Sequence, residues 1–106
     1  MGQGALLFRA SLGDVLRAER MRLGMTLRDL SSSARVSLGY ISEIERGQKE
    51  ASSECLAAVC GALAVPLSVV LSGVSGELAR EEAVAASVSS LPTAAATVVG
   101  VQDMAA

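Results

Sequence analysis

The residues best suited to chemistry lie in one short stretch, VSLGYISEIERGQKEAS, which occupies residues 36–52. Val36, Ile41 and Ile44 are five and three residues apart, so they can share the buried face of a helix. The polar residues between them then point outward and offer hydroxyl, phenol and carboxylate groups. Such groups form hydrogen bonds, so we expect the outer surface of this helix to bind a partner.

The rest of the sequence argues against catalysis. The chain contains no histidine, which removes the commonest general base and the commonest metal ligand. It also lacks a nucleophile motif, a glycine-rich phosphate loop and a cluster of metal ligands. Cys55 and Cys60 would lie about 140° apart around a helix, which suits neither a redox pair nor chelation. We expect no enzyme activity, no metal and no cofactor, and we expect both cysteines to be small buried hydrophobic residues.

Charge is distributed unevenly along the chain. The net charge of −2 argues against a nucleic-acid partner when it is taken for the whole chain. Residues 1–50, however, carry eight basic and six acidic side chains, whereas residues 51–106 carry one basic and five acidic ones. The positive half contains the stretch described above. This asymmetry indicates a partner for the first half of the chain.

The composition predicts a small all-α protein. Apolar residues make up 51% of the 106 residues but aromatic residues only 2%, so any core is aliphatic. Abundant alanine and leucine with two prolines favour helices. There is no apolar run of membrane-spanning length and no secretion signal, so we expect a cytoplasmic protein with no membrane partner.

Helix signals divide residues 11–73 into five short helices. The candidate N-cap residues are Ser11, Thr26, Ser37 and either Ser52 or Ser53. Asp29 follows Thr26 at the spacing of a capping box, and Gly24 and Gly47 end the first and third helices. Pro66 is acceptable in the first turn of the fifth helix.

The flanks of this domain are predicted separately. Residues 1–10 are expected to form a flexible N-terminal arm. Residues 74–91 form a C-terminal segment with a sixth helix over residues 76–91, and residues 92–106, which have no apolar period, form a flexible tail.

A short second helix, a three-residue turn and a third helix follow one another in the order of a helix-turn-helix. In that motif the second helix enters the major groove of DNA and places its N-terminal residues at the base edges. Two alternatives are an ordinary surface helix of a small bundle and a protein-interaction module that keeps the fold without binding DNA.

The pieces LGMTLRDLS, SEIERGQ and ALAVPL resemble the Cro and phage-repressor (Xre-type) helix-turn-helix family, over the run from Leu16 to Leu67. The stretch VSLGYISEIERGQKEASSE is similar to small actinobacterial activators of Clp protease genes. This resemblance implies a five-helix DNA-binding domain with a C-terminal dimerisation helix. It also implies a transcriptional activator that binds an inverted repeat in double-stranded DNA as a homodimer and contacts RNA polymerase. An antitoxin-type or phage-type repressor is the alternative.

The same resemblance implies roles for individual residues. The base-reading positions are Ser37, Leu38, Gly39, Tyr40 and Glu43. The phosphate-contacting positions are Thr26, Leu27, Arg28, Arg46, Gln48 and Lys49. Leu38 is then expected to meet a thymine methyl group, Gly39 to allow close backbone approach, and Glu43 to accept a hydrogen bond from a cytosine amino group. The Tyr40 hydroxyl can donate to a phosphate or a base.

Two further expectations concern charged residues in the domain. The family has an internal ion pair at positions that correspond to Arg20 and Glu45, and this predicts a partly buried pair between the first and third helices. Arg35 stands where the family's turn usually has glycine or asparagine. It can adopt a positive φ at modest cost or contact a phosphate, and the sequence does not choose between these roles.

The C-terminal residues are predicted to serve interactions between proteins. The apolar residues in excess of what a small core needs are Val74, Leu78, Val84, Ala85, Val88 and Leu91, which predicts dimerisation unless this helix folds back on its own domain. The terminus Met104, Ala105 and Ala106 resembles a degradation tag captured by Clp-type proteases. The alternative is a tail without function.

Overall fold

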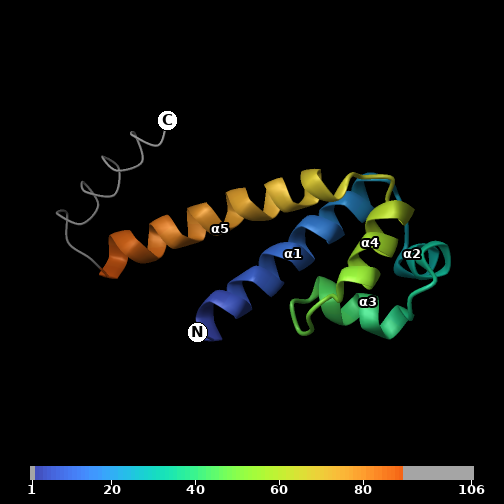
Figure 1. The fold of residues 1–106 in the computed structure, drawn as a ribbon, viewed down its shortest axis with the longest axis horizontal. Coiled ribbons are helices and arrows are strands. Elements are labelled where there is room, and N and C mark those ends of the chain that lie inside the picture. The colour runs from blue at the N-terminus through green and yellow to red at the C-terminus, as the bar shows by residue number, and fades with distance from the viewer. Residues whose placement is uncertain (1, 90–106) are drawn as a thin grey trace.

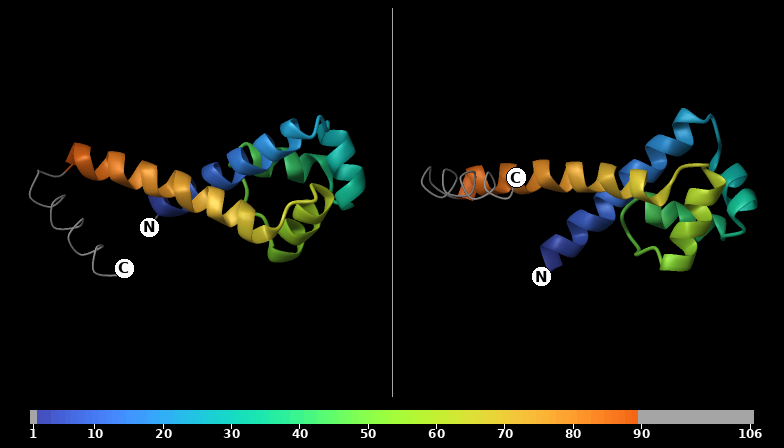
Figure 2. Two further views of the ribbon diagram at one scale, coloured as in Figure 1. Left: turned by 90° about the horizontal axis from the view of Figure 1, so that it is seen from above. Right: turned by 45° about the horizontal axis from the view of Figure 1, so that its top comes forward.

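Helices account for most of the chain in the computed structural model, which describes residues 2–89. Their bounds are α1 Gly2–Arg22, α2 Leu27–Ala34, α3 Leu38–Glu45, α4 Ser53–Ala62 and α5 Leu67–Ser89. The described range contains no strand, so the predicted all-α fold is confirmed. Figure 1 shows α2, α3 and α4 gathered at one end, while α5 lies beside α1 and extends away from that cluster. The two further views in Figure 2 show the same arrangement.

The core is built from aliphatic and sulfur-containing side chains, as the composition predicted. Its buried hydrophobic members are Leu12, Leu16, Leu30, Ala34, Ile41, Ile44, Cys55, Val59, Cys60, Leu63, Val65, Val70 and Val74. All five helices contribute to this cluster. Burial raises the pKa of both cysteine thiols, because desolvation disfavours the thiolate. The two cysteines are therefore packing residues.

Local hydrogen bonds begin α2, α3 and α4 as predicted. The Thr26 hydroxyl accepts the Asp29 N–H at 3.0 Å, and the Asp29 carboxylate accepts the Thr26 N–H at 2.9 Å. The bond from the Thr26 backbone N–H lowers the pKa of the Asp29 carboxyl, because it favours the charged form. Ser37 and Ser52 each accept the backbone N–H of the residue three positions on. Each helix start is thus determined by residues that are close together in the sequence.

The predicted start of the first helix at Ser11 is wrong, and so is the flexible arm over residues 1–10. Helix α1 begins at Gly2 and passes through Ser11, which is buried. Tertiary contacts explain the longer helix. Phe8 lines a groove whose other wall is α5, and Arg9 forms an ion pair with Glu50 at 3.2 Å. These contacts hold the additional turns in helical conformation.

The predicted division of the C-terminal part into two helices is also wrong, because α5 continues through Gly73 and Gly76. A glycine inside a helix costs about 1 kcal/mol relative to alanine. Burial of Val70 and Val74 offsets this cost, since both side chains belong to the core. Gly73 also lies close to Val15 of α1, whose two methyl groups would be 3.4 and 3.5 Å from an added Cβ atom. Core burial and the contact between Gly73 and α1 therefore favour one continuous helix.

Candidate nucleic-acid interface

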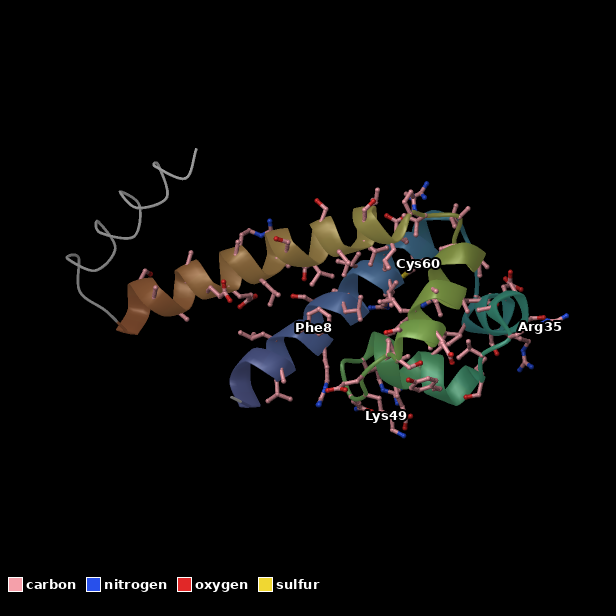
Figure 3. All side chains as sticks on the ribbon, viewed as in Figure 1. Phe8, Arg35, Lys49 and Cys60 are labelled. Atoms are coloured by element: carbon pink, nitrogen blue, oxygen red, sulfur yellow. The ribbon has the colours of Figure 1, made fainter. Side chains whose placement is uncertain are left out.

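The turn between α2 and α3 depends on Arg35. This residue has φ 60° and ψ 42°, the left-handed conformation that the family usually assigns to glycine or asparagine. Its N–H and that of Val36 both donate to the Ser31 carbonyl oxygen, at 2.8 and 3.2 Å. The Ser31 hydroxyl in turn donates to the Val36 carbonyl oxygen at 2.6 Å. Figure 3 shows the Arg35 side chain pointing outward, so Arg35 both adopts the positive φ and presents a cation.

Helix α3 has an exposed beginning and a buried end. Leu38 and Gly39 in its first turn are exposed, and no atom lies within 4 Å of a Cβ added at Gly39. Ile41, Ile44 and Glu45 are buried. A helix held in this way presents its N-terminal turn on a rigid base, which is the geometry required of a helix that enters the major groove.

Tyr40 makes contacts that the sequence did not predict. Its hydroxyl donates to the Glu50 carbonyl oxygen at 2.8 Å and accepts the Ser52 N–H at 3.2 Å. Both partners lie beyond the end of α3, in the loop that leads to α4. The hydroxyl that was expected to meet a phosphate or a base therefore already has two partners within the protein.

The loop after α3 carries the polar side chains that were predicted to contact phosphate. The Arg46 guanidinium donates to the Ser42 hydroxyl and, at 3.2 Å, to the Gln48 side-chain oxygen. The Lys49 ammonium lies 3.6 Å from the Glu43 carboxylate, and both side chains are exposed enough to exchange this pairing for another. Figure 3 shows Lys49 at the outer surface. The Glu43 carboxylate, which is expected to read a base, and the Lys49 ammonium, which is expected to contact a phosphate, are therefore neighbours.

The start of α2 brings the remaining predicted phosphate contacts to the same region. Thr26 and Arg28 are exposed, and Leu27 is partly buried against the core. A polar hollow of about 550 Å³ lies between α1, α2 and α3, with Leu27 and Arg46 on its wall. Arg17 also lines this hollow, although the sequence analysis did not select it. Its position three residues before Arg20 was the available signal, because this spacing places both on one face of α1.

Arg20 and Glu45 form an ion pair inside the domain. The Arg20 guanidinium donates from Nε and Nη2 to the two carboxylate oxygens of Glu45 at 2.8 and 3.0 Å, and from Nη1 to the Met25 carbonyl oxygen at 2.8 Å. The two side chains are only 11% and 6% exposed. The hydrogen bond to Glu45 raises the pKa of Arg20 despite the opposing effect of burial. This pair joins α1 to the end of α3 and so fixes the helix that carries the exposed turn.

Two glycines bring backbones together beneath the same helix. A Cβ atom at Gly13 would lie 2.5 Å from the carbonyl oxygens of both Ile44 and Glu45. One at Gly47, where φ is +75°, would lie 3.1 Å from the Ala10 Cα atom. Sequence reasoning assigned Gly47 to the helix end but did not single out Gly13. Only glycine permits this contact between α1 and the end of α3.

The predicted dimerisation residues lie in different environments. Val74 is buried in the core, so its assignment to surface apolar area is wrong. Leu78 is partly buried, whereas Val84 is 60% exposed and Ala85 is also exposed. Leu78 and Phe8 line a groove of about 340 Å³ between α1 and α5, and Figure 3 shows Phe8 between these helices. The Val88 side chain, Leu91 and the predicted tag Met104, Ala105 and Ala106 lie outside the described residues.

The described part of the chain holds no group of three or more Cys, Asp or Glu side chains placed to bind a metal ion. None of its helices is by itself long and apolar enough to cross a membrane, and α4 with α5 meets that criterion only as a pair bent by 107°.

Known proteins share both the sequence and the fold of this domain. A family model described as a helix-turn-helix domain matches residues 11–71. The chain belongs to the helix-turn-helix family. The transcriptional regulator ClgR of Mycobacterium tuberculosis is 60% identical over 81 residues, which cover 76% of this chain and 72% of that protein. The Cro and phage-repressor-type resemblance of the sequence is thereby confirmed.

Solved structures give the same result. The clp gene regulator ClgR from C. glutamicum is 51% identical and superposes with a TM-score of 0.62, covering 65% of this chain and 90% of that chain. The restriction-modification controller protein C.Esp1396I is 25% identical with a TM-score of 0.63, covering 67% of this chain and 91% of that chain. This helix-turn-helix chain therefore shares its domain with DNA-binding transcriptional regulators.

Proposed function

We propose that this protein acts in the cytoplasm as a sequence-specific regulator that inserts the first turn of α3 into the major groove. The observation that carries the proposal is the division of α3 into an exposed, small-residue beginning and a buried, ion-paired end. The exposed turn can approach base edges closely, while the buried end keeps it in position.

The exposed side of α3 selects the bases. Leu38 is 41% exposed and contacts a thymine methyl group. Gly39 has open space in front of it, which lets the backbone approach the groove. Glu43 accepts a hydrogen bond from a cytosine amino group after its pairing with Lys49 is exchanged. Ser37 caps the helix beside them.

Phosphate contacts surround this turn and supply affinity that depends on salt. One set of backbone phosphates meets the start of α2, through Thr26, Leu27 and Arg28. Another set meets the loop after α3, through Arg46, Gln48 and Lys49. Arg17 joins them, because it shares the polar hollow with Arg46.

The targets and the assembly follow from the relatives. The C. glutamicum relative is a clp gene regulator, which supports genes of the Clp protease system as targets. The proposal adds that the protein activates these genes through RNA polymerase. Two copies bind an inverted repeat, because one recognition helix reads too few base pairs to select a promoter. The exposed apolar residues Phe8 and Val84, on α1 and α5, support a dimer interface along these helices.

Selection of bound sequences from a random duplex pool tests the proposal. The expected product is an inverted repeat whose half-sites are about 10 base pairs apart. Glu43→Ala should change the selected bases, whereas Lys49→Ala should weaken binding to all sequences and flatten the salt dependence by about one unit. A pool that shows no enrichment would refute specific DNA binding and favour a protein-interaction module.

Gly39→Ala separates DNA binding from stability. Alanine meets no atom in the free protein, so folding stability should rise by roughly 0.5–1 kcal/mol. Operator affinity should fall at least about tenfold, because the added methyl group prevents close approach to the groove. Gly61→Ala in α4 is the matched control, since its added Cβ atom also meets nothing. It should raise stability without weakening binding, and equal affinity of both variants would exclude α3 as the reader.

The dimer is tested in the full chain by sedimentation. Val84→Gln should shift the population toward monomer, because Val84 lies on the exposed part of α5. Met21→Gln is the control, since Met21 is similarly exposed, at 57%, but lies at the opposite end of α1 from Phe8. Unchanged sedimentation of both variants would place the interface elsewhere.

The C-terminal tag rests on the sequence alone. If Met104, Ala105 and Ala106 are captured by a Clp-type protease, the regulator is removed by the enzyme whose synthesis it promotes. Changing Ala105 and Ala106 to Asp should lengthen the half-life several-fold and leave DNA affinity unaltered. An unchanged half-life would remove this role.

A further inference from the structure

The loop between α3 and α4 must hold its cations in place without secondary structure of its own. It runs over residues 46–52 and contains Arg46 and Lys49. Surface loops are mobile by default, and a mobile loop loses affinity because binding must order it. Contacts that fix the loop before DNA arrives would remove this cost.

The Tyr40 hydroxyl makes such a contact from within α3. Through its bonds at 2.8 and 3.2 Å it reaches across ten residues to the Glu50 carbonyl oxygen and across twelve to the Ser52 N–H. Ser52 is the N-cap of α4. One hydroxyl thus joins the first turn of the recognition helix to the last part of the loop and to the start of the next helix.

Helix α1 holds the same loop from the other side. The Glu50 carboxylate pairs with Arg9 at 3.2 Å, and Gly47 approaches the backbone of Ala10. Glu50 therefore has two contacts, a hydrogen bond from Tyr40 to its carbonyl and an ion pair between Arg9 and its largely exposed carboxylate. Lys49 lies next to this residue and points outward.

We propose that Tyr40 is a positioning residue whose hydroxyl orders this loop, so that Lys49 meets a phosphate while α3 reads the bases. The inference rests on the proposed function, and it assigns the hydroxyl to the loop instead of to a base edge. Its effect on DNA is exerted through Lys49. Removing the hydroxyl therefore changes the phosphate contacts and leaves the base preference intact.

Tyr40→Phe tests this role, because it retains the ring and removes only the hydroxyl. We expect the Kd for the selected operator to rise about three- to tenfold. The salt dependence should flatten by up to about one unit, since each phosphate contact contributes about 0.9. Affinities for single-base operator variants should keep their order, and circular dichroism should report a folded protein. Loss of fold stability alone would not alter a salt slope.

A double-mutant cycle with Lys49→Ala identifies the route of the effect. In the Lys49→Ala background, Tyr40→Phe should change Kd by less than about twofold, because the cation that the hydroxyl positions is absent. An equal effect in both backgrounds, a changed order of base preference, or an unchanged salt slope would overturn the inference. Failure of the unmodified protein to select any sequence would refute the proposed function instead, so the two failures are distinguishable.

Discussion

Replacing Glu45 by glutamine tests how strongly the buried ion pair holds α3 in place. The side chain keeps its size but loses its charge. In the native protein, Arg20 donates to both carboxylate oxygens of Glu45 and to the Met25 carbonyl oxygen. Glutamine retains one acceptor, so the substitution leaves a guanidinium cation inside the domain with an incomplete set of partners. That cation is only 11% exposed, so it recovers little of its hydration.

The expected cost follows from this burial. Breaking a buried pair by removing one partner typically costs about 3–5 kcal/mol. A small domain is stabilised by roughly 5–15 kcal/mol in total, so Glu45→Gln should remove a large part of it. The control is Glu19→Gln, which breaks the pair with Arg22 at 2.9 Å. The Arg22 side chain is 62% exposed, so this loss should stay below about 1 kcal/mol.

Urea unfolding followed by far-ultraviolet circular dichroism measures both variants. The protein concentration must be the same throughout, since the stability of any oligomer depends on it. A double variant, Arg20→Met with Glu45→Leu, removes both charges and should recover most of the lost stability. The reasoning would be refuted if Glu45→Gln unfolded within about 1 kcal/mol of the unmodified protein and alongside Glu19→Gln.

Three other outcomes are expected in solution. Gly13→Ala should lower the free energy of unfolding by about 1–3 kcal/mol or more, because its Cβ atom meets two backbone carbonyls of α3; a melt equal to that of Gly61→Ala would contradict this. Cys55 and Cys60 should react with iodoacetamide only on unfolding, since burial raises the pKa of both thiols; rapid labelling of the native protein would count against it. The Asp29 pKa is lowered on folding, so its contribution to stability is present above about pH 4 and is lost as the pH falls through the folded pKa. When the free energy of unfolding is measured as the pH is lowered, the Asp29→Asn variant should not show this loss of stability. Identical dependence on pH in the variant and the unmodified protein would refute the prediction.

The features that the sequence determined are those set by neighbours in the chain. Thr26 with Asp29, Ser37 and Ser52 each cap a helix through a bond that spans three residues. The left-handed turn at Arg35 was expected as one of two roles, because a family position that usually has glycine or asparagine indicates positive φ. Local hydrogen bonding and apolar spacing decide such features before the domain packs.

Family resemblance also predicted one contact between residues that are far apart in the sequence. It located Arg20 and Glu45, which are 25 positions apart, although no local pattern joins them. Residue spacing alone would not have paired these two charges among the many on the surface.

Other features depended on which surfaces meet in space. Ser11 looks like a helix start, yet α1 passes through it, because Phe8 in an earlier turn faces α5 across a groove and Arg9 pairs with Glu50. Val74 was assigned to apolar area in excess of the core, yet its side chain is buried in that core. The Tyr40 hydroxyl finds its partners ten and twelve residues away, where the loop folds back beside α3. The free energy of these contacts comes from packing of distant segments, so tertiary structure overrides the local signal of a serine cap or of a glycine in a helix.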